Sequence, residues 1–507
     1  MSARIVVAGG GIGGLACALL LARAGHEVTV VERDASRAVA GGDEAFAAWE
    51  RPSVRQWALV HNFSARSRGL LAERLPDVLQ RLRDDGVEEV NPLALLLAPE
   101  RQRPDDERLT GLLCRRPAFE LALRRAVEAQ AGLTVRVATV AGLEFAEEGP
   151  GAAGGVGAGS GDAGSPPHVR GVRLSDGETL AADLVVDAGG RRTRVPAWLA
   201  ETGIELPTAI QPCELTYHSR YYRAAPGVRP DYLGMPRGDL GHLFYWTFVG
   251  DHGTYGAAIG APPWEPGYLP LRDNAAWEAL TAAIPPLAAW MEAAGGEPLH
   301  DVQVMANNRN LRRRYVVDGR PLVTGLVAIG DALAATNPMR AWGAAMALTH
   351  ACAVADVVGG AGGGERRGAR DAAATALAYD AAVAEETDLV YEVSAAADRI
   401  RTHRWKGLPI PASDARAAEE EELLQHGLLP AIGSEPELLR ALLRSMGLVD
   451  RPDALFADPA VLARAREERA RRDPAASAPA GPGREETLAL LAGIAPAAGV
   501  SREEAVR

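Results

Sequence analysis

The sequence predicts an α/β chain in which a Rossmann-like, dinucleotide-binding domain is interrupted by an antiparallel-sheet domain and followed by a C-terminal helical region. Two glycine motifs predict the first domain. An apolar run at residues 4–8 leads into the loop Gly9-Gly10-Gly11-Ile12-Gly13-Gly14, and a second apolar run far along the chain leads into Gly330-Asp331. Between residues 213 and 262, alternating aromatic residues predict the strands of an antiparallel sheet. One nucleotide is therefore expected to be held from both ends of the chain.

The surroundings of the first glycine loop match a βαβ unit. Residues 15–24 are rich in Ala and Leu, Gly25 can end that helix, and residues 27–32 form a second strand that closes on Glu32. In such a unit the glycines allow a tight turn and a close approach to a pyrophosphate, which the N–H groups at the helix N-terminus face. Glu32 lies where a carboxylate would accept hydrogen bonds from ribose hydroxyls. The alternative is an ordinary glycine-rich turn between a strand and a helix.

The length and charge of the chain limit the other possibilities. Its 507 residues exceed one ordinary core, so two or three structural units are expected. Its net charge of −12 argues against nucleic acid or an anionic membrane as a partner, because phosphate binding requires a basic surface. No apolar run is long enough to span a membrane, and no signal peptide precedes the first strand. The four cysteines are widely spaced and indicate neither disulfides nor a zinc site, so a cytoplasmic, reducing setting is expected.

Composition and periodicity divide the chain into five stretches. They are 1–205, the first part of the nucleotide domain; 206–310, the antiparallel-sheet domain; 311–360, the return segment with Gly330-Asp331; 361–472, the C-terminal helices; and 473–507, a linker and tail. Within the first stretch, the pattern predicts a loop at residues 33–52, one helix at 64–83 and another at 117–131. Residues 149–167 are nearly all Gly, Ala, Ser and Pro, which predicts a flexible hairpin tip.

The order of these motifs resembles that of the FAD-dependent monooxygenases of the aromatic hydroxylase type, the group A flavoproteins. The glycine loop with Glu32, the turn Asp187-Ala188-Gly189, and Gly330-Asp331-Ala332 followed by Asn337-Pro338 and Gly343 carry the resemblance, over about residues 1–360. Residues 217–222 and 250–254 are similar to a bacterial branch of mostly uncharacterised FAD-dependent oxidoreductases. The resemblance implies that the Rossmann-like domain binds FAD and that the antiparallel sheet binds the substrate.

The resemblance also implies which residues bind FAD. The loop glycines would face the pyrophosphate, Glu32 the adenosine ribose and Asp331 a ribityl hydroxyl. Arg116, just before a helix, would reach the pyrophosphate or ribityl region, although neighbouring Arg115 makes this assignment ambiguous. The full set that the resemblance implies is Gly9, Gly11, Gly13, Gly14, Glu32, Arg33, Arg116, Val140, Asp331, Pro338, Gly343 and Ala344.

Residues 337–343 would form the loop under the isoalloxazine edge, where the N-terminus of the next helix can stabilise negative charge on the reduced ring. The family often has a glycine and a polar residue where this chain has Ala341 and Trp342. Two interpretations of Trp342 are open. It either packs beneath the start of the helix or forms a wall of the substrate pocket.

The sequence identifies no catalytic acid or base, and its candidates are His61 and Trp342. His61 precedes a helix in a region that can approach the flavin, but such a histidine is more often structural. His218 and His242 lack partners at ligand spacing, so no metal is expected. Aromatic strand faces are more often core than site, but they can also line a pocket. The candidate substrate residues are Tyr217, Tyr221, Phe244, Trp246 and Trp342.

The activity that the resemblance implies is that of an FAD-dependent monooxygenase. It would insert one oxygen atom from O2 into a hydrophobic, aromatic or alkene-containing small molecule of specialised metabolism, through a flavin C4a-hydroperoxide. Hydroxylation and epoxidation both fit. Electrons would come from NAD(P)H directly or through a partner flavin reductase, and the lack of a second dinucleotide motif fits either supply. A monomer or a homodimer is expected.

Three other functions are compatible with the sequence. A flavin-dependent reductase or dehydrogenase of prenyl or polyene substrates has the same fold. A flavin-dependent halogenase also has it, although the W-x-W-x-I-P segment is missing from this chain. A non-catalytic flavin-binding protein is the third, because the loop around Trp342 departs from the family pattern.

Overall fold

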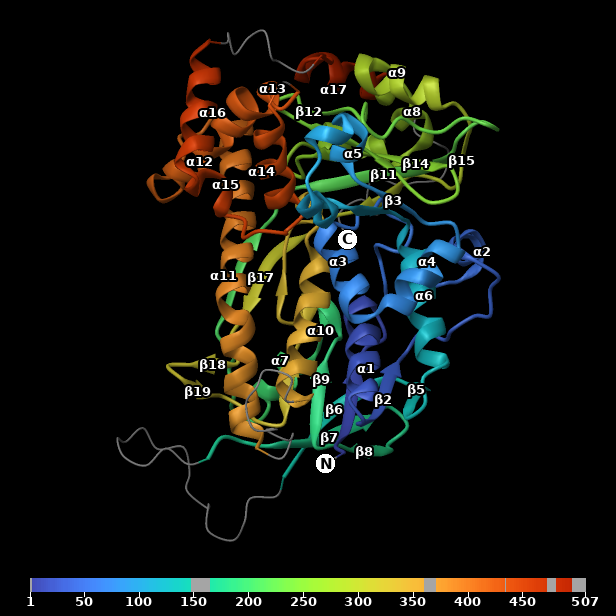
Figure 1. Ribbon diagram of the computed structural model, residues 1–507, viewed down its shortest axis with the longest axis vertical. Coiled ribbons are helices and arrows are strands. Elements are labelled where there is room, and N and C mark those ends of the chain that lie inside the picture. Colours follow the sequence, from blue (N-terminus) through green and yellow to red (C-terminus); the bar gives the residue numbers. More distant parts are fainter. Residues whose placement is uncertain (1, 147–164, 360–370, 434, 472–479, 495–507) are drawn as a thin grey trace.

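The computed structural model describes residues 2–146, 165–359, 371–433, 435–471 and 480–494. A parallel sheet of five strands, in the order β20-β9-β1-β2-β5, lies in the lower half of Figure 1. Its strands are β1 (Arg4–Ala8), β2 (Glu27–Glu32), β5 (Leu133–Val137), β9 (Leu184–Asp187) and β20 (Leu326–Ala328). Strand β20, from the return segment, pairs with β9, so both parts of the nucleotide domain form one sheet. The Rossmann-like architecture predicted from the two motifs is confirmed.

Helices α1 (Ile12–Arg23) and α10 (Gly343–Gly359) pack closely against each other beside this sheet. Their contact is made by small residues, since a Cβ added to Gly13 would lie only 3.1 Å from the Cβ of Ala347. The long helix α11 (Ala372–Trp405) runs along α10, and α3 (Ala65–Arg74) contacts α10 as well (Figure 1). Apolar residues of α1, α10 and the sheet form the main core. The packing brings the N-terminal glycine loop and the return segment together.

Two local predictions in the first stretch are wrong. Residues 64–83 form two helices, because α3 ends at Arg74 and α4 (Pro76–Asp84) begins after Leu75, whose φ of −138° is not helical. Proline disfavours helical backbone at the residue before it, which explains the break. Residues 33–52, predicted as a loop, contain the short helix α2 (Gly42–Ala48). The N–H of Gly42 donates to Asp85 at 2.8 Å, so a tertiary contact supports this helix.

The antiparallel domain contains a six-stranded sheet in the order β12-β13-β14-β11-β15, with β16 also paired to β11. Between β13 and β14 the chain turns through His252 and Gly253, both at positive φ, so the two strands form a hairpin. The alternating aromatic pattern therefore identified the sheet correctly. Its strands are β11 (Thr216–Arg223), β12 (Arg237–Asp239), β13 (Phe244–Val249), β14 (Thr254–Ala261), β15 (Glu297–Pro298) and β16 (Gln303–Met305).

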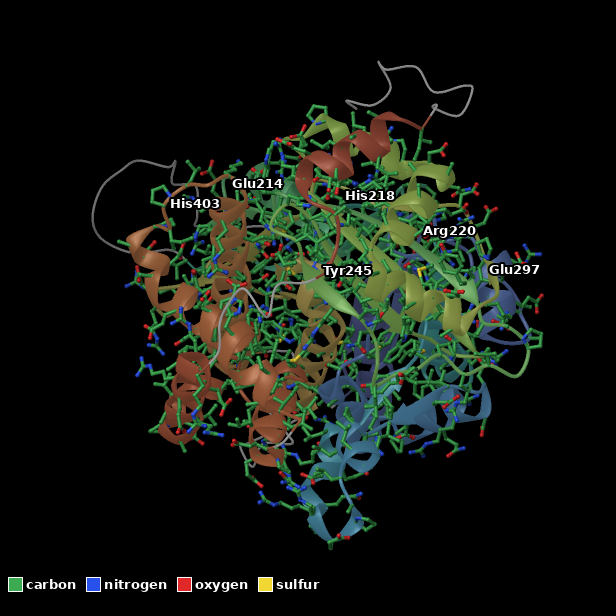
Figure 2. All side chains as sticks on the ribbon, turned by 90° about the horizontal axis from the view of Figure 1, so that it is seen from above. Glu214, His218, Arg220, Tyr245, Glu297 and His403 are labelled. Atoms are coloured by element: carbon green, nitrogen blue, oxygen red, sulfur yellow. The ribbon has the colours of Figure 1, made fainter. Side chains whose placement is uncertain are left out.

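One face of this sheet is covered by helices α8 (Asn274–Ala283), α9 (Pro285–Ala294) and α17 (Arg484–Ala492). Trp277 of α8 and Leu491 of α17 share a buried apolar cluster with Tyr245. Arg220 points to this side, where it donates to Glu278 of α8 at 2.7 Å. Figure 2 views the molecule from above these helices and labels Arg220 and Tyr245. The helices are an addition to the sheet predicted for residues 206–310, and they leave its other face toward the nucleotide domain.

The C-terminal helices form a small bundle at one end of α11 (Figure 1). They enclose an apolar cluster of their own that includes Leu428 and Leu442. The helical region predicted from residue 361 onward is therefore present in the described residues. Its further members are α12 (Ala415–Leu423), a π-helical turn (Leu424–Leu428), α13 (Leu429–Ala431), α14 (Pro436–Met446), α15 (Ala454–Ala457) and α16 (Pro459–Arg471).

Two of the predicted segments lie largely outside the part of the chain that the structure describes. The hairpin tip predicted at residues 149–167 lies mostly outside the described residues, and so does most of the linker predicted within 473–507. Among the helices of the described residues, none is long and apolar enough to cross a membrane. The remaining elements are α5 (Pro92–Leu96), α6 (Arg116–Glu128), α7 (Val195–Ala200), β3 (Glu88–Val90), β4 (Gly111–Leu113), β6 (Val140–Phe145), β7 (Val169–Leu174), β8 (Thr179–Ala181), β10 (Thr208–Pro212), β17 (Arg309–Arg313), β18 (Val316–Val317), β19 (Arg320–Pro321) and β21 (Ala334–Ala335).

Candidate active site

The glycine loop is packed so tightly that side chains are excluded at two of its positions. Gly9 has a φ of 120°, and a Cβ added there would lie 2.4 Å from the carbonyl oxygen of Ala188. A Cβ added to Gly14 would lie 2.0 Å from the carbonyl oxygen of Gly9. At Gly11 the space is open, and the guanidinium of Arg116 lies 3.9 Å from an added Cβ. Gly11 therefore faces a space that the positive end of Arg116 borders.

The N-terminus of α1 and Arg116 together suit an anion beside Gly11. No side chain of the described residues caps α1, so its first N–H groups and the partial positive charge of the helix end are available to a ligand. Arg116 is half-buried and donates to Glu120, one turn further along α6, at 2.7 Å. Arg115 is instead buried against Asp251, to which its Nε donates at 3.1 Å. Of the two arginines, Arg116 lies next to the loop.

Glu32 ends β2 with its carboxylate close to the glycine loop. Its Oε2 accepts hydrogen bonds from the N–H of Gly10 at 2.7 Å and from Arg51 at 3.2 Å. Its Oε1 accepts one from the N–H of Asp34 at 2.9 Å. A carboxylate offers about four acceptor sites, so about one remains for a ribose hydroxyl. The geometry fits the adenosine end of FAD.

Arg33 and Val140 lie near Glu32. Residue Glu32 pairs with Val137 at the end of β5, and Val140 begins β6 shortly afterwards. Arg33 is exposed and Val140 is half-buried. Both lie at the carboxyl edge of the sheet, where the adenosine end is expected, and their contact with a cofactor stays a prediction.

Asp331 approaches the same edge of the sheet from the return segment. The N–H of Gly330 donates to Nδ1 of His350 at 3.0 Å, and Nε2 of His350 lies 3.1 Å from the Thr387 hydroxyl on α11. Burial lowers the pKa of His350 to about 3, so the neutral ring bridges the turn and α11. The Asp331 carboxylate makes no hydrogen bond within the described residues, and Nε of Arg191 lies 4.0 Å from it. It is free to accept a bond from a hydroxyl.

Residues 337–343, which we name the flavin loop, lie next to this carboxylate. Pro338 and Gly343 are exposed, and Ala344 is half-buried at the start of α10. A Cβ added to Gly343 would lie 3.9 Å from Oδ1 of Asp331. Ala341 has a φ of 55°, a left-handed conformation that costs a residue with a side chain about 1–2 kcal/mol. The glycine that the resemblance leads one to expect at this position would be free of this cost.

Trp342 packs against the C-terminal region. Its indole is buried with Val390 of α11 and with Leu448, and its Nε1 donates to the carbonyl oxygen of Met446 at 3.0 Å. The guanidinium of Arg340 lies 5.2 Å from its ring centroid. These contacts match the packing interpretation of Trp342. Its role as a wall of the substrate pocket stays a prediction.

The sheet face opposite α8 and α9 carries four of the five aromatic residues predicted for the substrate. Tyr217 and Phe244 are buried, with ring centroids 5.8 Å apart, and the half-buried Trp246 lies 5.0 Å from Phe244. The hydroxyl of Tyr217 donates to Asn337 of the flavin loop. That of Tyr221 accepts a hydrogen bond from the N–H of His61 at 3.1 Å. This face therefore contacts two segments of the nucleotide domain.

Small residues of β14 run between these aromatic residues. Gly256, Ala258 and Gly260 lie opposite Tyr221, Ser219 and Tyr217 of β11, and opposite Phe248, Trp246 and Phe244 of β13. A Cβ on Gly260 would lie 2.3 Å from the Phe244 ring, and one on Gly256 would lie 2.4 Å from Val60. Side chains introduced at these two glycines would collide with the residues that pack over β14.

His61 lies between the sheet and the nucleotide domain. Its Nδ1 is 2.7 Å from the carbonyl oxygen of Leu59, and its ring stacks on Phe63 with centroids 6.1 Å apart. Burial lowers the pKa of His61 to about 4, and the charge of Arg116 acts in the same direction. A neutral imidazole near Arg116 could accept a hydrogen bond from a ligand, and this role stays a prediction.

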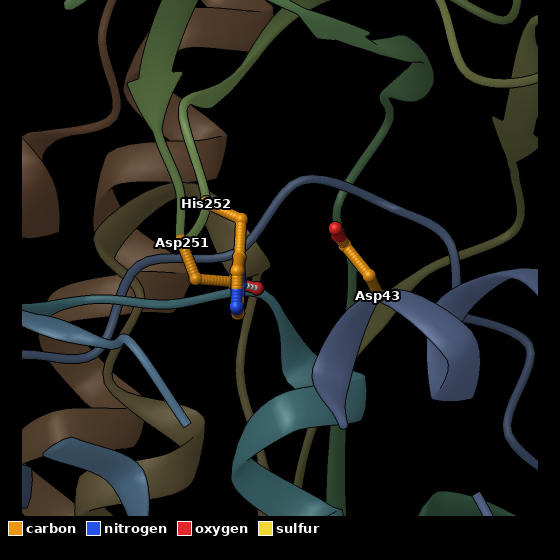
Figure 3. Close-up of side chains that lie close together, drawn as sticks. All are labelled: Asp43, Asp251 and His252. Atoms are coloured by element: carbon orange, nitrogen blue, oxygen red, sulfur yellow. Dashed lines mark hydrogen bonds and ion pairs between the residues drawn. The ribbon is translucent and has the colours of Figure 1, made fainter. Parts of the chain in front are cut away.

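Asp43, Asp251 and His252 form a cluster whose potential ligand atoms all lie within 4.8 Å of one another (Figure 3). Both carboxylates are already paired with arginines. Arg115 contacts both aspartates, and Arg223 donates to Asp43 at 2.8 Å. The cluster is thus an ion-pair network that joins α2 and the start of α6 to the β13–β14 hairpin.

Three residues of the candidate site were missed by sequence reasoning. Arg51 is buried among the carboxylates of Glu32, Asp34 and Glu120. Glu120 forms ion pairs with both Arg51 and Arg116. Its spacing of one helical turn from Arg116 is a sequence signal that could have identified Glu120 as a site residue. Asp398 of α11 bonds to Asn337 at 2.6 Å, and no local pattern marks it.

Comparisons with known protein sequences agree with a Rossmann-like fold at the N-terminus of the chain. Residues 7–43 match the model of an NAD(P)-binding Rossmann-like domain. Over 183 residues the chain is 30% identical to Protein Rv3254 of Mycobacterium tuberculosis (strain ATCC 25618 / H37Rv). That match covers 34% of this chain and 35% of the relative, so the chain spans about a third of the curated relative's length.

Solved structures similar to this one include flavin-dependent enzymes. The flavin-dependent brominase Bmp2 has a TM-score of 0.57 at 15% identity, over 93% of this chain and 100% of its own. PqsL, a probable FAD-dependent monooxygenase from Pseudomonas aeruginosa, has a TM-score of 0.53 at 17% identity, over 80% of this chain and 99% of its own. The flavin-dependent halogenase CmlS has a TM-score of 0.55 at 16% identity, over 84% of this chain and 70% of its own. At these identities the likeness establishes a shared fold.

Proposed function

We propose that this chain, which has the fold of the flavin-dependent monooxygenases and halogenases, is an FAD-dependent monooxygenase that acts on a hydrophobic small molecule. The observation that carries the proposal is the convergence of four features at one edge of the parallel sheet. They are the open space at Gly11 beside Arg116, the carboxylate of Glu32, the carboxylate of Asp331, which accepts no hydrogen bond from the described residues, and the flavin loop. Together they suit the pyrophosphate, ribose, ribityl chain and ring of one FAD.

Bound FAD would supply the redox chemistry that activates dioxygen. The residues of the chain would bind and orient it. Arg116 and the N-terminus of α1 would neutralise the pyrophosphate, and Glu32 and Asp331 would accept hydrogen bonds from hydroxyls at the two ends. The N-terminus of α10, directly after the flavin loop, would favour negative charge near the ring.

The substrate would bind between the aromatic sheet face and the flavin loop. Tyr217 and Phe244, which are buried in one apolar cluster with Trp246, would contribute ring surface to this site, and Tyr221 accepts a hydrogen bond from the N–H of His61. PqsL, which shares the fold, is known in complex with 2-aminobenzoylacetate, an aromatic compound. An aromatic or alkene-containing substrate fits this surface best, with NAD(P)H as the electron donor, directly or through a partner flavin reductase.

The proposal is tested by supplying the purified chain with FAD and then with NADH or NADPH, or with dithionite-reduced FAD in place of a reductase. A panel of phenols and polyenes is offered under isotopically labelled dioxygen, and products are analysed by mass spectrometry. We expect a product that carries one labelled oxygen atom. Products that form without dioxygen would contradict the proposal and support a reductase or dehydrogenase.

A halogenase is the second candidate, because Bmp2 and CmlS share the fold over most of this chain. Repeating the panel with bromide and chloride separates the two activities. Halogenated product that requires halide would replace the monooxygenase proposal. Bound FAD that is neither reduced by NAD(P)H nor productive after chemical reduction would indicate a non-catalytic flavin-binding protein.

A further inference from the structure

A buried group of polar side chains lies beneath the flavin loop, and its centre is a charged residue of α11. Asp398 is 1% exposed, and its carboxylate accepts hydrogen bonds from Asn337 at 2.6 Å and from Asn310 of β17 at 2.7 Å. Nη1 of Arg401, one turn further along α11, donates to it at 2.5 Å. A helix outside the nucleotide domain thus supplies the charge to which the loop is bonded.

Asn337 depends on this carboxylate for its orientation. Its side-chain oxygen accepts hydrogen bonds from the hydroxyl of Tyr217 and from the N–H of Met339 at 3.2 Å. Its side-chain N–H donates to Asp398, and its backbone N–H donates to Asn310 at 2.8 Å. Because Asn337 starts the flavin loop, the Asp398 carboxylate orients the loop. It also orients the side-chain oxygen that bonds to Tyr217 of the antiparallel sheet.

The positive charge of Arg401 compensates the negative charge of Asp398 in this buried site. The guanidinium is buried, with its side chain 4% exposed, and Nη2 also donates to the carbonyl oxygen of Cys213 at the entry to the antiparallel domain. Removing one partner of a buried ion pair leaves the other charge without compensation. Each single substitution therefore changes the net charge beneath the loop by one unit, in opposite directions.

We propose that Asp398 and Arg401 are positioning residues of the flavin site, which hold the flavin loop through Asn337 and set the electrostatic potential beside the ring. This inference rests on the proposed function, because it requires FAD against that loop. A net positive charge there stabilises the anionic reduced ring, whereas a net negative charge opposes it. The C-terminal helical region is in this way a part of the flavin site.

The test is the midpoint potential of bound FAD in the wild-type chain and in Asp398→Asn and Arg401→Gln, measured by dye equilibration. We expect a higher potential in Asp398→Asn and a lower one in Arg401→Gln. Asp388→Asn is the matched control, because Asp388 lies on the same helix but is paired with Arg312 and Arg314, and it makes no hydrogen bond or ion pair to the flavin loop within the described residues. It should leave the potential at the wild-type value.

Shifts of the same sign in both variants, or no shift in either, would overturn the inference. If a variant binds FAD too weakly for its midpoint potential to be measured, the FAD dissociation constant replaces the potential as the readout. Far-ultraviolet circular dichroism then shows whether the variant is folded. Weaker binding in folded Asp398→Asn than in Asp388→Asn supports the positioning role, whereas equal binding overturns it. Arg401→Lys keeps the charge and should restore the wild-type potential. A wild-type chain that binds no FAD would instead refute the proposed function.

Discussion

Arg115 and Asp251 form a buried, bidentate ion pair between the nucleotide domain and the antiparallel sheet. Nε of Arg115 donates to Oδ1 of Asp251 at 3.1 Å and Nη2 donates to Oδ2 at 2.7 Å. The N–H of Arg115 donates to Oδ1 at 2.6 Å. Asp251 sits in the turn of the β13–β14 hairpin, so this pair fixes the aromatic sheet to the residue before Arg116. It holds the aromatic sheet face next to the segment that carries Arg116.

Replacement of Asp251 is expected to destabilise the chain strongly. Burial raises the pKa of Asp251, but hydrogen bonds from His252 and Arg115 and the guanidinium charge outweigh it and bring the pKa well below its usual range. Asp251→Asn leaves the Arg115 charge buried with less compensation, which should lower the free energy of unfolding by about 3–5 kcal/mol. Urea unfolding at neutral pH measures this loss.

The control for Asp251→Asn is Glu88→Gln. Glu88 pairs with Arg229 on the surface, where both side chains are about half or more exposed. Surface pairs contribute about 0–1 kcal/mol, so the control should be nearly neutral. Equal losses in the two variants would contradict the role assigned to the Arg115–Asp251 pair.

His350 is expected to make stability depend on pH. Burial lowers its pKa to about 3, and the charge of Arg312 acts in the same direction. In the unfolded chain the imidazole binds a proton below about pH 6.5. The unfolded state therefore binds more protons between these values, and stability falls as the pH decreases, by up to about 1.4 kcal/mol per pH unit. Urea unfolding between pH 7 and pH 4 should show a shallower fall in His350→Gln.

Thr387→Val is the control for this pH effect. It removes the hydroxyl beside Nε2 of His350 but keeps the imidazole. Stability should decrease at every pH while the pH dependence between pH 7 and pH 4 is retained. If His350→Gln follows the wild-type pH dependence, the histidine does not titrate as its burial predicts.

Ala341→Gly should stabilise the chain. Ala341 is held at a φ of 55°, where the strain of a side chain exceeds the entropy that glycine loses on folding. A gain of up to about 1 kcal/mol is expected as a higher Tm. The same change at the exposed, helical Ala382 should instead cost about 1 kcal/mol. A lower Tm for Ala341→Gly would show that the left-handed position is not strained.

Trp342→Gln separates the two interpretations of this residue. If the indole also borders the substrate, turnover of a substrate found in the panel should fall more than the FAD content. The variant is compared with the wild type at a temperature where both are folded, because the indole is buried against Val390 and Leu448. Equal losses of FAD and turnover would leave packing as its role.

Much of the fold could be predicted because its signals are local. The strand from Arg4 to Ala8, the glycines that follow it, and the strand that ends on Glu32 lie within one short segment. The aromatic alternation from Tyr217 to Tyr221 likewise identified an antiparallel sheet, although β11 is buried on both faces. Local signals failed where tertiary contacts decide the structure, as at the short helix α2, which Asp85 supports from a distant helix end.

The candidate site could be predicted only where the resemblance supplied residue roles. The sequence could not show which of Arg115 and Arg116 faces the glycine loop. The structure distinguishes them, because Arg115 is buried in an ion pair with Asp251. Arg51, at the centre of three carboxylates, and Asp398, beneath the flavin loop, carry no signal in their neighbouring residues. Their partners lie far away in the chain, and only the fold brings them together.

The most direct test of the account is FAD binding by the purified chain, measured by isothermal titration calorimetry for the wild type and for Asp331→Ala. Asp331 leaves its carboxylate without a hydrogen bond among the described residues, next to the flavin loop. We predict that the wild type binds one FAD per chain and that Asp331→Ala folds normally but retains little FAD. A wild-type chain that binds no FAD, or a variant that binds it as tightly as the wild type, would contradict the account.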